Sequence, residues 1–205
     1  MINQLYFILS IFIVGFSFST LLFSGLKDQI RYLVSPLIGI AFYSFTVGAL
    51  YCLNTSITIA KIYFILFLLW SLILFLNFKY QENDFKTVFT NIFINHFSLS
   101  TLGIFLIYTF LGFIFIHIGS PNVSPDSTQY EGVGRFLAQG GTIKDKIPEL
   151  PFLINGRFLT IGAMHCINRL FGSYNLYSLY PLLTVWFSIL LGAVLLKLSS
   201  GLSSK

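Results

Sequence analysis

The sequence predicts an all-α protein: a polytopic bundle of transmembrane helices, with amphipathic juxtamembrane helices in one large external loop. Of its 205 residues, 56% are hydrophobic and only 9% are charged, which is more apolar surface than a soluble domain of this length can enclose. The apolar residues gather in runs of about 20, the length that an α-helix needs to cross the hydrocarbon core of a bilayer. The lipid bilayer is therefore the first expected partner.

Five apolar runs are long enough to be spans. A short polar link, NTSIT, separates the second run from the third, and a charged segment, KYQENDFK, follows the third. Pro36 lies near the start of the second run and suits the first turn of a helix, where no hydrogen bond is lost. The expected spans are at about 5–26, 33–53, 57–78, 99–118 and 176–196.

Basic residues in the short loops indicate how the spans are oriented, because such residues prefer the cytoplasmic side. Lys27 and Arg31 follow the first run, and Lys79 and Lys86 follow the third. This places the N-terminus and the loop 119–174 outside the cytoplasm. We expect a multi-pass protein of the inner (plasma) membrane, with this loop on its external, periplasmic face.

The formal net charge of +5 does not indicate a nucleic-acid partner. The twelve basic residues are scattered among apolar segments and form no basic face. Cys52 and Cys166 lack the spacing of metal ligands, so we expect two free thiols. No metal ligands can be named from the sequence, and metal dependence and any cofactor are left open.

The start of the external loop, PNVSPDSTQYEGVGRFLAQGG, has the pattern of a short amphipathic helix. Thr128 and Glu131 have the spacing of a capping box, which predicts that the helix begins there. Gly140 and Gly141 are expected to end it. Residues three or four apart form one apolar stripe, typical of a helix that lies along a membrane surface: Tyr130, Val133, Gly134 and Leu137.

A second helix is expected in PFLINGRFLTIGAMHCINRLFG. It is apolar on one side, and the 3.6-residue period of a helix gathers its polar residues on the other. Such a stripe at a membrane surface can bind phosphate or sugar hydroxyls, or it can simply face water. Its members are Arg157, His165, Asn168 and Arg169.

Asp126 is the candidate catalytic residue. It lies a few residues beyond the end of the fourth run, between a proline and a new helix. Its carboxylate is therefore expected near the membrane surface, where it can act as a general base or bind an acceptor or a metal. An acidic residue beside a helix start can equally be a cap that accepts hydrogen bonds from backbone N–H groups.

The order of these parts resembles the start of the C-type glycosyltransferase superfamily of multispanning membrane enzymes. Asp126, Tyr130, the stretch from Arg135 to Ala138, and Gly140 with Gly141 match the family pattern, and so does Leu170 to Gly172 before the last run. The resemblance implies that Asp126 is the catalytic carboxylate, which deprotonates or orients the acceptor. Sugar is then transferred from a polyprenyl-phosphate donor. The expected substrate-binding residues are Tyr130, Arg135, Arg157 and His165.

The resemblance divides the chain into two parts. Residues 1–98 hold about three spans that the resemblance does not explain, and residues 99–205 form the glycosyltransferase-like unit. Members of the superfamily continue with many more spans. We therefore expect a chain that is truncated at its C-terminus or that works with a partner membrane subunit.

Two functions remain open at this point. The leading hypothesis is a membrane glycosyltransferase, or a truncated fragment of one, that acts on an envelope acceptor with a lipid-linked sugar donor. The alternative is a non-enzymatic membrane component of envelope polysaccharide assembly or transport. Transport by a proton relay would need ionisable residues inside the spans, and the predicted span interiors contain almost none.

Overall fold

The computed structural model describes residues 2–23, 28–81, 125–142 and 156–172, together with the single positions 107, 110 and 114. All the secondary structure in this part of the chain is α-helical, as the sequence predicts. The helices are α1 (Ile2–Leu22), α2 (Asp28–Cys52), α3 (Ile59–Gln81), α6 (Pro125–Ala138) and α7 (Gly156–Leu170). Apart from the three single positions, the fourth and fifth predicted spans lie outside the described residues.

The first three predicted runs are helices, with ends that differ from the expected ones by a few residues. Thr58 caps the start of α3, since its Oγ1 accepts a hydrogen bond of 3.4 Å from the backbone N–H of Lys61. Pro36 was expected in a first turn, but α2 begins at Asp28, so Pro36 lies inside the helix. There it cannot donate the usual helical hydrogen bond to the carbonyl of Tyr32.

Two of the described helices contain a stretch long and apolar enough to cross a membrane. These stretches are Val34–Cys52 in α2 and Ile59–Asn77 in α3, whereas α1 contributes a shorter apolar stretch, Tyr6–Leu22. On α3, Phe64, Phe67 and Phe75 are each more than 60% exposed. Aromatic side chains exposed along a whole helix are characteristic of a surface covered by lipid or protein, so this part of the chain is compatible with a membrane protein.

Small residues lie where α1 crosses α2. Gly15 and Ser19 are one turn apart on α1, and Ser35 and Gly39 are one turn apart on α2. The hydroxyl oxygens of Ser19 and Ser35 are 3.3 Å apart, and a Cβ on Gly15 would collide with the backbone of Ser35 and, at 2.7 Å, of Gly39. Small residues spaced by four allow two backbones to approach this closely, a common arrangement in membrane helix pairs.

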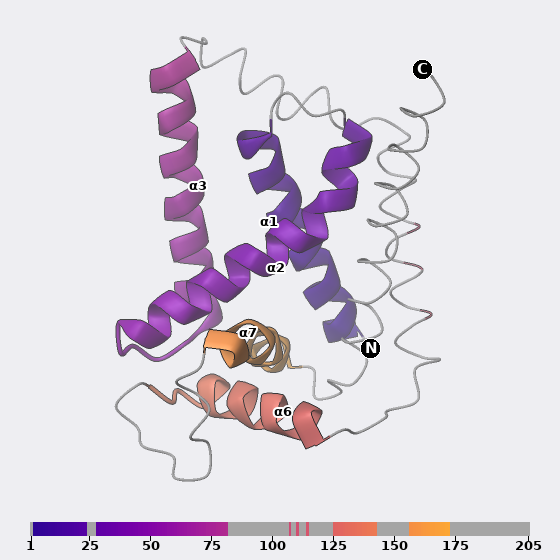
Figure 1. The fold of residues 1–205 in the computed structure, drawn as a ribbon, viewed down its shortest axis with the longest axis vertical. Helices are drawn as coiled ribbons and strands as arrows, with labels where there is room; N and C mark the ends of the chain where they lie inside the picture. Colours follow the sequence, from indigo (N-terminus) through magenta and orange to yellow (C-terminus); the bar gives the residue numbers. More distant parts are fainter. Residues whose placement is uncertain are drawn as a thin grey trace, which may run out of the picture.

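The three long helices define two ends of the molecule (Figure 1). At one end, Asn77 donates a hydrogen bond of 2.9 Å to the carbonyl of Leu21, and Nε of Arg31 donates one of 3.1 Å to the carbonyl of Phe23. The guanidinium of Arg31 thus lies at the negative end of the α1 dipole. The opposite end holds the start of α1, the link between α2 and α3, and the helices α6 and α7 (Figure 1).

Candidate functional site

The site is built on α6, which begins with Pro125 and Asp126. Proline suits the first position of a helix, because its φ is already helical and its missing N–H would have had no partner there. The expectation that the helix starts at Thr128 with a capping box is therefore wrong. The helix starts earlier, and Glu131 contacts arginine side chains instead.

The C-terminal end of α6 is a Schellman motif. Gly140 has a φ of 88°, which favours glycine. The N–H of Gly141 donates to the carbonyl of Phe136 at 3.0 Å, and the N–H of Gly140 donates to that of Leu137 at 3.2 Å. The prediction that Gly140 and Gly141 end the helix is confirmed.

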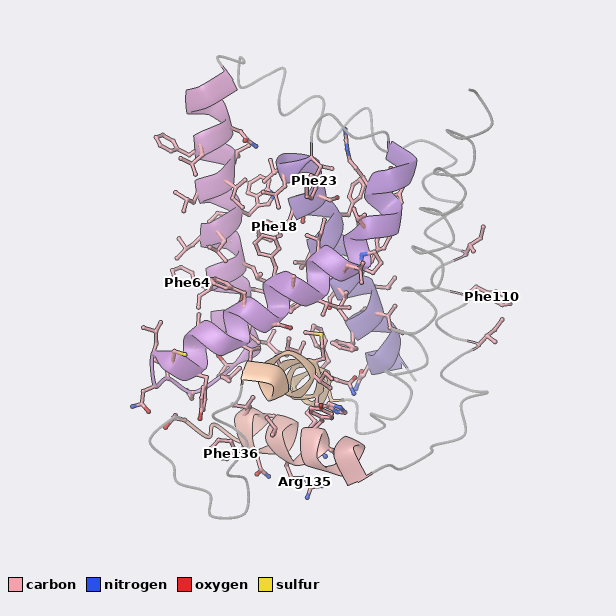
Figure 2. The ribbon with its side chains drawn as sticks, in the orientation of Figure 1. Phe18, Phe23, Phe64, Phe110, Arg135 and Phe136 are labelled. Carbon is pink, nitrogen blue, oxygen red and sulfur yellow. The ribbon has the colours of Figure 1, made fainter. Side chains whose placement is uncertain are left out.

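The apolar stripe of α6 is buried, but against protein. Val133 and Leu137 belong to the core, and so do Ala163 and Ile167 of α7. In Figure 2 Arg135, which is not part of the stripe, extends from the side of α6 that faces away from α7. The described part of the stripe therefore serves to hold α6 on α7.

Two glycines bring α6 and α7 into close contact. A Cβ added to Gly134 would collide with His165 and would lie 2.9 Å from the backbone nitrogen of Cys166. A Cβ added to Gly162 would lie 2.5 Å from Cγ1 of Val133. Each helix thus offers a glycine to the backbone or side chains of the other, and little room remains between them.

A carboxylate with two arginine partners links the helices beside this crossing. Oε1 of Glu131 accepts a hydrogen bond of 2.5 Å from Nη2 of Arg169 on α7, and one of 3.2 Å from Nη2 of Arg135 on α6. The side chains of Glu131 and Arg169 are 18% and 15% exposed, whereas that of Arg135 is 57% exposed. Partial burial acts to raise the pKa of Glu131, but the hydrogen bonds and positive charges of the two arginines outweigh it and lower that pKa.

The polar side chains of α7 that the structure describes are enclosed rather than turned to water. His165 is 1% exposed, and Asn168 is also buried. Burial lowers the pKa of His165 to about 4, with the positive charge of Arg169 acting in the same direction and Glu131 opposing it. The imidazole is therefore neutral at neutral pH.

α7 is in turn attached to the start of α1. Nδ2 of Asn3 donates a hydrogen bond of 3.3 Å to the carbonyl of Gly172, and the rings of Phe7 and Phe171 lie 6.1 Å apart. α7 also packs against α2. The α6–α7 pair is thus fixed to the long helices through α7.

The predicted site residues divide into two groups. The backbones of Asp126 and Arg157 lie in the first turns of α6 and α7, but their side chains lie outside what the structure describes, so their roles stay predictions. Tyr130, one turn after Asp126, is half-buried. Arg135 forms an ion pair with Glu131, and His165 is near enough to Glu131 for its negative charge to act on the imidazole.

Sequence reasoning missed the contact between Glu131 and Arg169. The spacing of Glu131 and Arg135 predicts their pairing within one helix, and this is confirmed. Arg169 lies on another helix, so no spacing along the chain indicates that it meets Glu131. Only the packing of α6 on α7 brings the two together.

The thiols and metal ligands give a simpler picture. Cys52 and Cys166 are both free, as predicted, and burial raises the pKa of Cys166 to about 12. Within the described segments, no group of three or more His, Cys, Asp or Glu residues is placed to hold a metal ion.

The sequence matches no protein-family model and no curated protein, and the fold matches no solved structure.

Proposed function

We propose that the chain is a membrane glycosyltransferase unit that transfers a sugar from a polyprenyl-phosphate donor to an envelope acceptor. The observation that carries this proposal is the position of α6. Asp126 is the second residue of this helix, which is held on α7 across one end of the long apolar helices (Figure 1). A lipid-linked donor presents its reacting phosphate at the same level, where the hydrocarbon core of a membrane ends.

The ends of the apolar stretches support this level. The stretch in α2 ends at Cys52, and the stretch in α3 begins at Ile59. The end of α2 and the start of α3 both lie at the end of the molecule that carries α6 and α7 (Figure 1). In the proposed orientation this end is external, on the periplasmic side of the inner membrane.

The proposed reaction needs one carboxylate close to the donor phosphate. Asp126 takes the proton from an acceptor hydroxyl, whose oxygen bonds to the anomeric carbon of the sugar as the bond from that carbon to the phosphate oxygen breaks. The polyprenyl phosphate leaves with the electron pair of that bond. No other group is required to balance the transfer.

The substrate-binding roles are assigned by exposure and position. Arg135 keeps 57% of its side chain exposed, so it can reach a phosphate while it remains beside Glu131. Tyr130 lies one turn from Asp126 and shares its side of α6, and Arg157 begins α7. His165 is enclosed beneath α6, so we assign it to the packing of α7.

Replacement of Asp126 tests this proposal. Membranes that contain the full chain are supplied with labelled polyprenyl-phosphate sugars, and label transferred to envelope material is counted. Asp126→Asn should lower the rate at least a hundredfold, the usual contribution of a general base. Asp28→Asn is the matched control, because Asp28 also begins a helix but lies at the other end of the molecule; it should stay within twofold. Equal rates for Asp126→Asn and the natural chain would overturn the proposal.

The second candidate is a non-enzymatic component of envelope polysaccharide assembly. The observation in its favour is that Glu131, His165 and Arg169 are engaged or enclosed within the protein. In that case Asp126→Asn would support polysaccharide assembly in cells as well as the natural chain does.

A further inference from the structure

We infer that Glu131 and Arg169 are positioning residues, which together hold α6 so that Asp126 stays in place for sugar transfer. This inference rests on the proposed function. It assigns a role to a contact between two helices that neither sequence pattern nor resemblance indicates. The carboxylate and guanidinium act through Asp126 and do not themselves touch the reacting atoms.

α6 takes its place in the molecule from α7. The elements packed against α7 are α6, α2 and α1, and its end is held to the start of α1 through Asn3 and Phe7. Among the described helices, α6 packs mainly on α7. A shift of α6 on α7 would therefore move Asp126 relative to the membrane.

The apolar contacts at the glycine crossing place no directional restraint on α6. Gly134 and Gly162 fix how closely the helices approach, and Val133 packs on Gly162, but these apolar contacts are non-directional. The bond from Arg169 to Glu131 is directional and charge-assisted. It adds the restraint that the glycines lack.

Glu131 is five residues after Asp126, which corresponds to about 7.5 Å along the axis of α6. A rotation of α6 about its crossing with α7 would therefore displace the catalytic carboxylate. A misplacement of about 1 Å at a reacting group can slow a reaction up to a hundredfold.

Glu131 is poorly suited to be the base itself. Two guanidinium groups donate to its Oε1, and its lowered pKa makes it a weak proton acceptor. A carboxylate so engaged is suited to hold a neighbour in place, which leaves the proton transfer to Asp126.

The test measures turnover and donor KM for Glu131→Gln, Arg169→Gln and the double variant of the full chain in its membrane. Each single variant should lower kcat about tenfold and leave KM unchanged, and the double variant should be no slower than either single one. Gln139→Ala, at an exposed residue directly after the end of α6, is the control and should keep full activity. Glu131→Gln with a kcat within twofold of the natural value would overturn the inference.

Hydrogen exchange of the α6 amides separates positioning from a general loss of fold. In Glu131→Gln the amides of α6 should exchange faster, while those of α2 keep their protection. Loss of protection in α2 as well would show a merely structural role and would overturn the inference. If Asp126→Asn proves as active as the natural chain, the proposed function itself fails. The Asp126 variant thus distinguishes failure of the proposed function from failure of the positioning role.

Discussion

His165 is a buried histidine that resists protonation in the folded protein. Its pKa is lowered to about 4, whereas an unfolded chain takes up the proton below about 6.5. Between these values the unfolded state binds more protons, so the stability of the folded protein falls as the pH drops through this window.

We therefore expect the natural protein to lose up to about 3 kcal/mol of unfolding free energy between pH 6.5 and pH 4 on account of His165. His165→Asn should flatten this part of the stability curve, measured by denaturant unfolding of the purified protein in detergent. Glu131 has a lowered pKa. Its contribution to the unfolding free energy is therefore present above the pKa of a glutamate in the unfolded chain, and it is lost as the pH falls through the lower pKa of the folded protein. A variant with the same slope as the natural protein would show that His165 is not the group responsible.

Other single residues show how far the sequence alone can predict a site. The spacing of Glu131 and Arg135 was enough to predict their contact, because neighbours on one helix are fixed by its period. The burial of His165 and the bond from Arg169 to Glu131 depend on a second helix. Local pattern carries no information on such contacts, so the polar stripe of α7 was open to several interpretations.

At the scale of elements, glycine decides how α6 packs on α7. We expect Gly134→Ala to cost about 1–3 kcal/mol, the usual range for an overpacked core, because its Cβ would collide with the backbone of α7. Gly48→Ala is the matched control, since a Cβ there meets nothing within 4 Å; it should be neutral or slightly stabilising, as alanine favours a helix. Thermal unfolding of the two variants in detergent compares them directly, and equal melting temperatures would contradict the packing shown here.

The helices themselves were predictable, and their ends only in part. Long apolar runs indicated α1, α2 and α3, and the glycine pair indicated the end of α6. Its start was missed because the capping-box spacing of Thr128 and Glu131 placed it at Thr128, although proline is well suited to begin a helix, as Pro125 does. Pro36 was placed in a first turn because apolar residues alone define a run, whereas α2 begins in the polar residues before it.

At the scale of the whole molecule, the arrangement of the helices could not be predicted from the sequence. The small residues at the α1–α2 crossing are visible as the spacings Gly15 to Ser19 and Ser35 to Gly39. Such spacings do not identify the partner helix, because any close-packed neighbour would suit them. The basic residues did predict that the loop 119–174 lies on the same side as the N-terminus, and the structure brings α6 and α7 to the end of the molecule that holds Asn3.

The side of the membrane on which that end lies can be measured with the natural cysteines. Cys52 is exposed at the end of α2 nearest to α6 and α7, whereas Cys166 is buried. Burial raises the pKa of the Cys166 thiol to about 12, so little of the reactive thiolate forms there at neutral pH. In the proposed orientation, in which this end is external, a membrane-impermeant maleimide added to intact cells should therefore label Cys52 and leave Cys166 unlabelled.

A cysteine directly before the start of α2 completes this test. Lys27→Cys in a Cys52→Ser background should be labelled only after the cells are permeabilised, because Lys27 precedes α2 in the short loop that the basic residues assign to the cytoplasm. The reverse result, with Lys27→Cys labelled in intact cells and Cys52 protected, would put α6, α7 and Asp126 on the cytoplasmic side. Asp126 would then face donors and acceptors of the cytoplasm, and transfer to an external envelope acceptor would be ruled out by geometry alone.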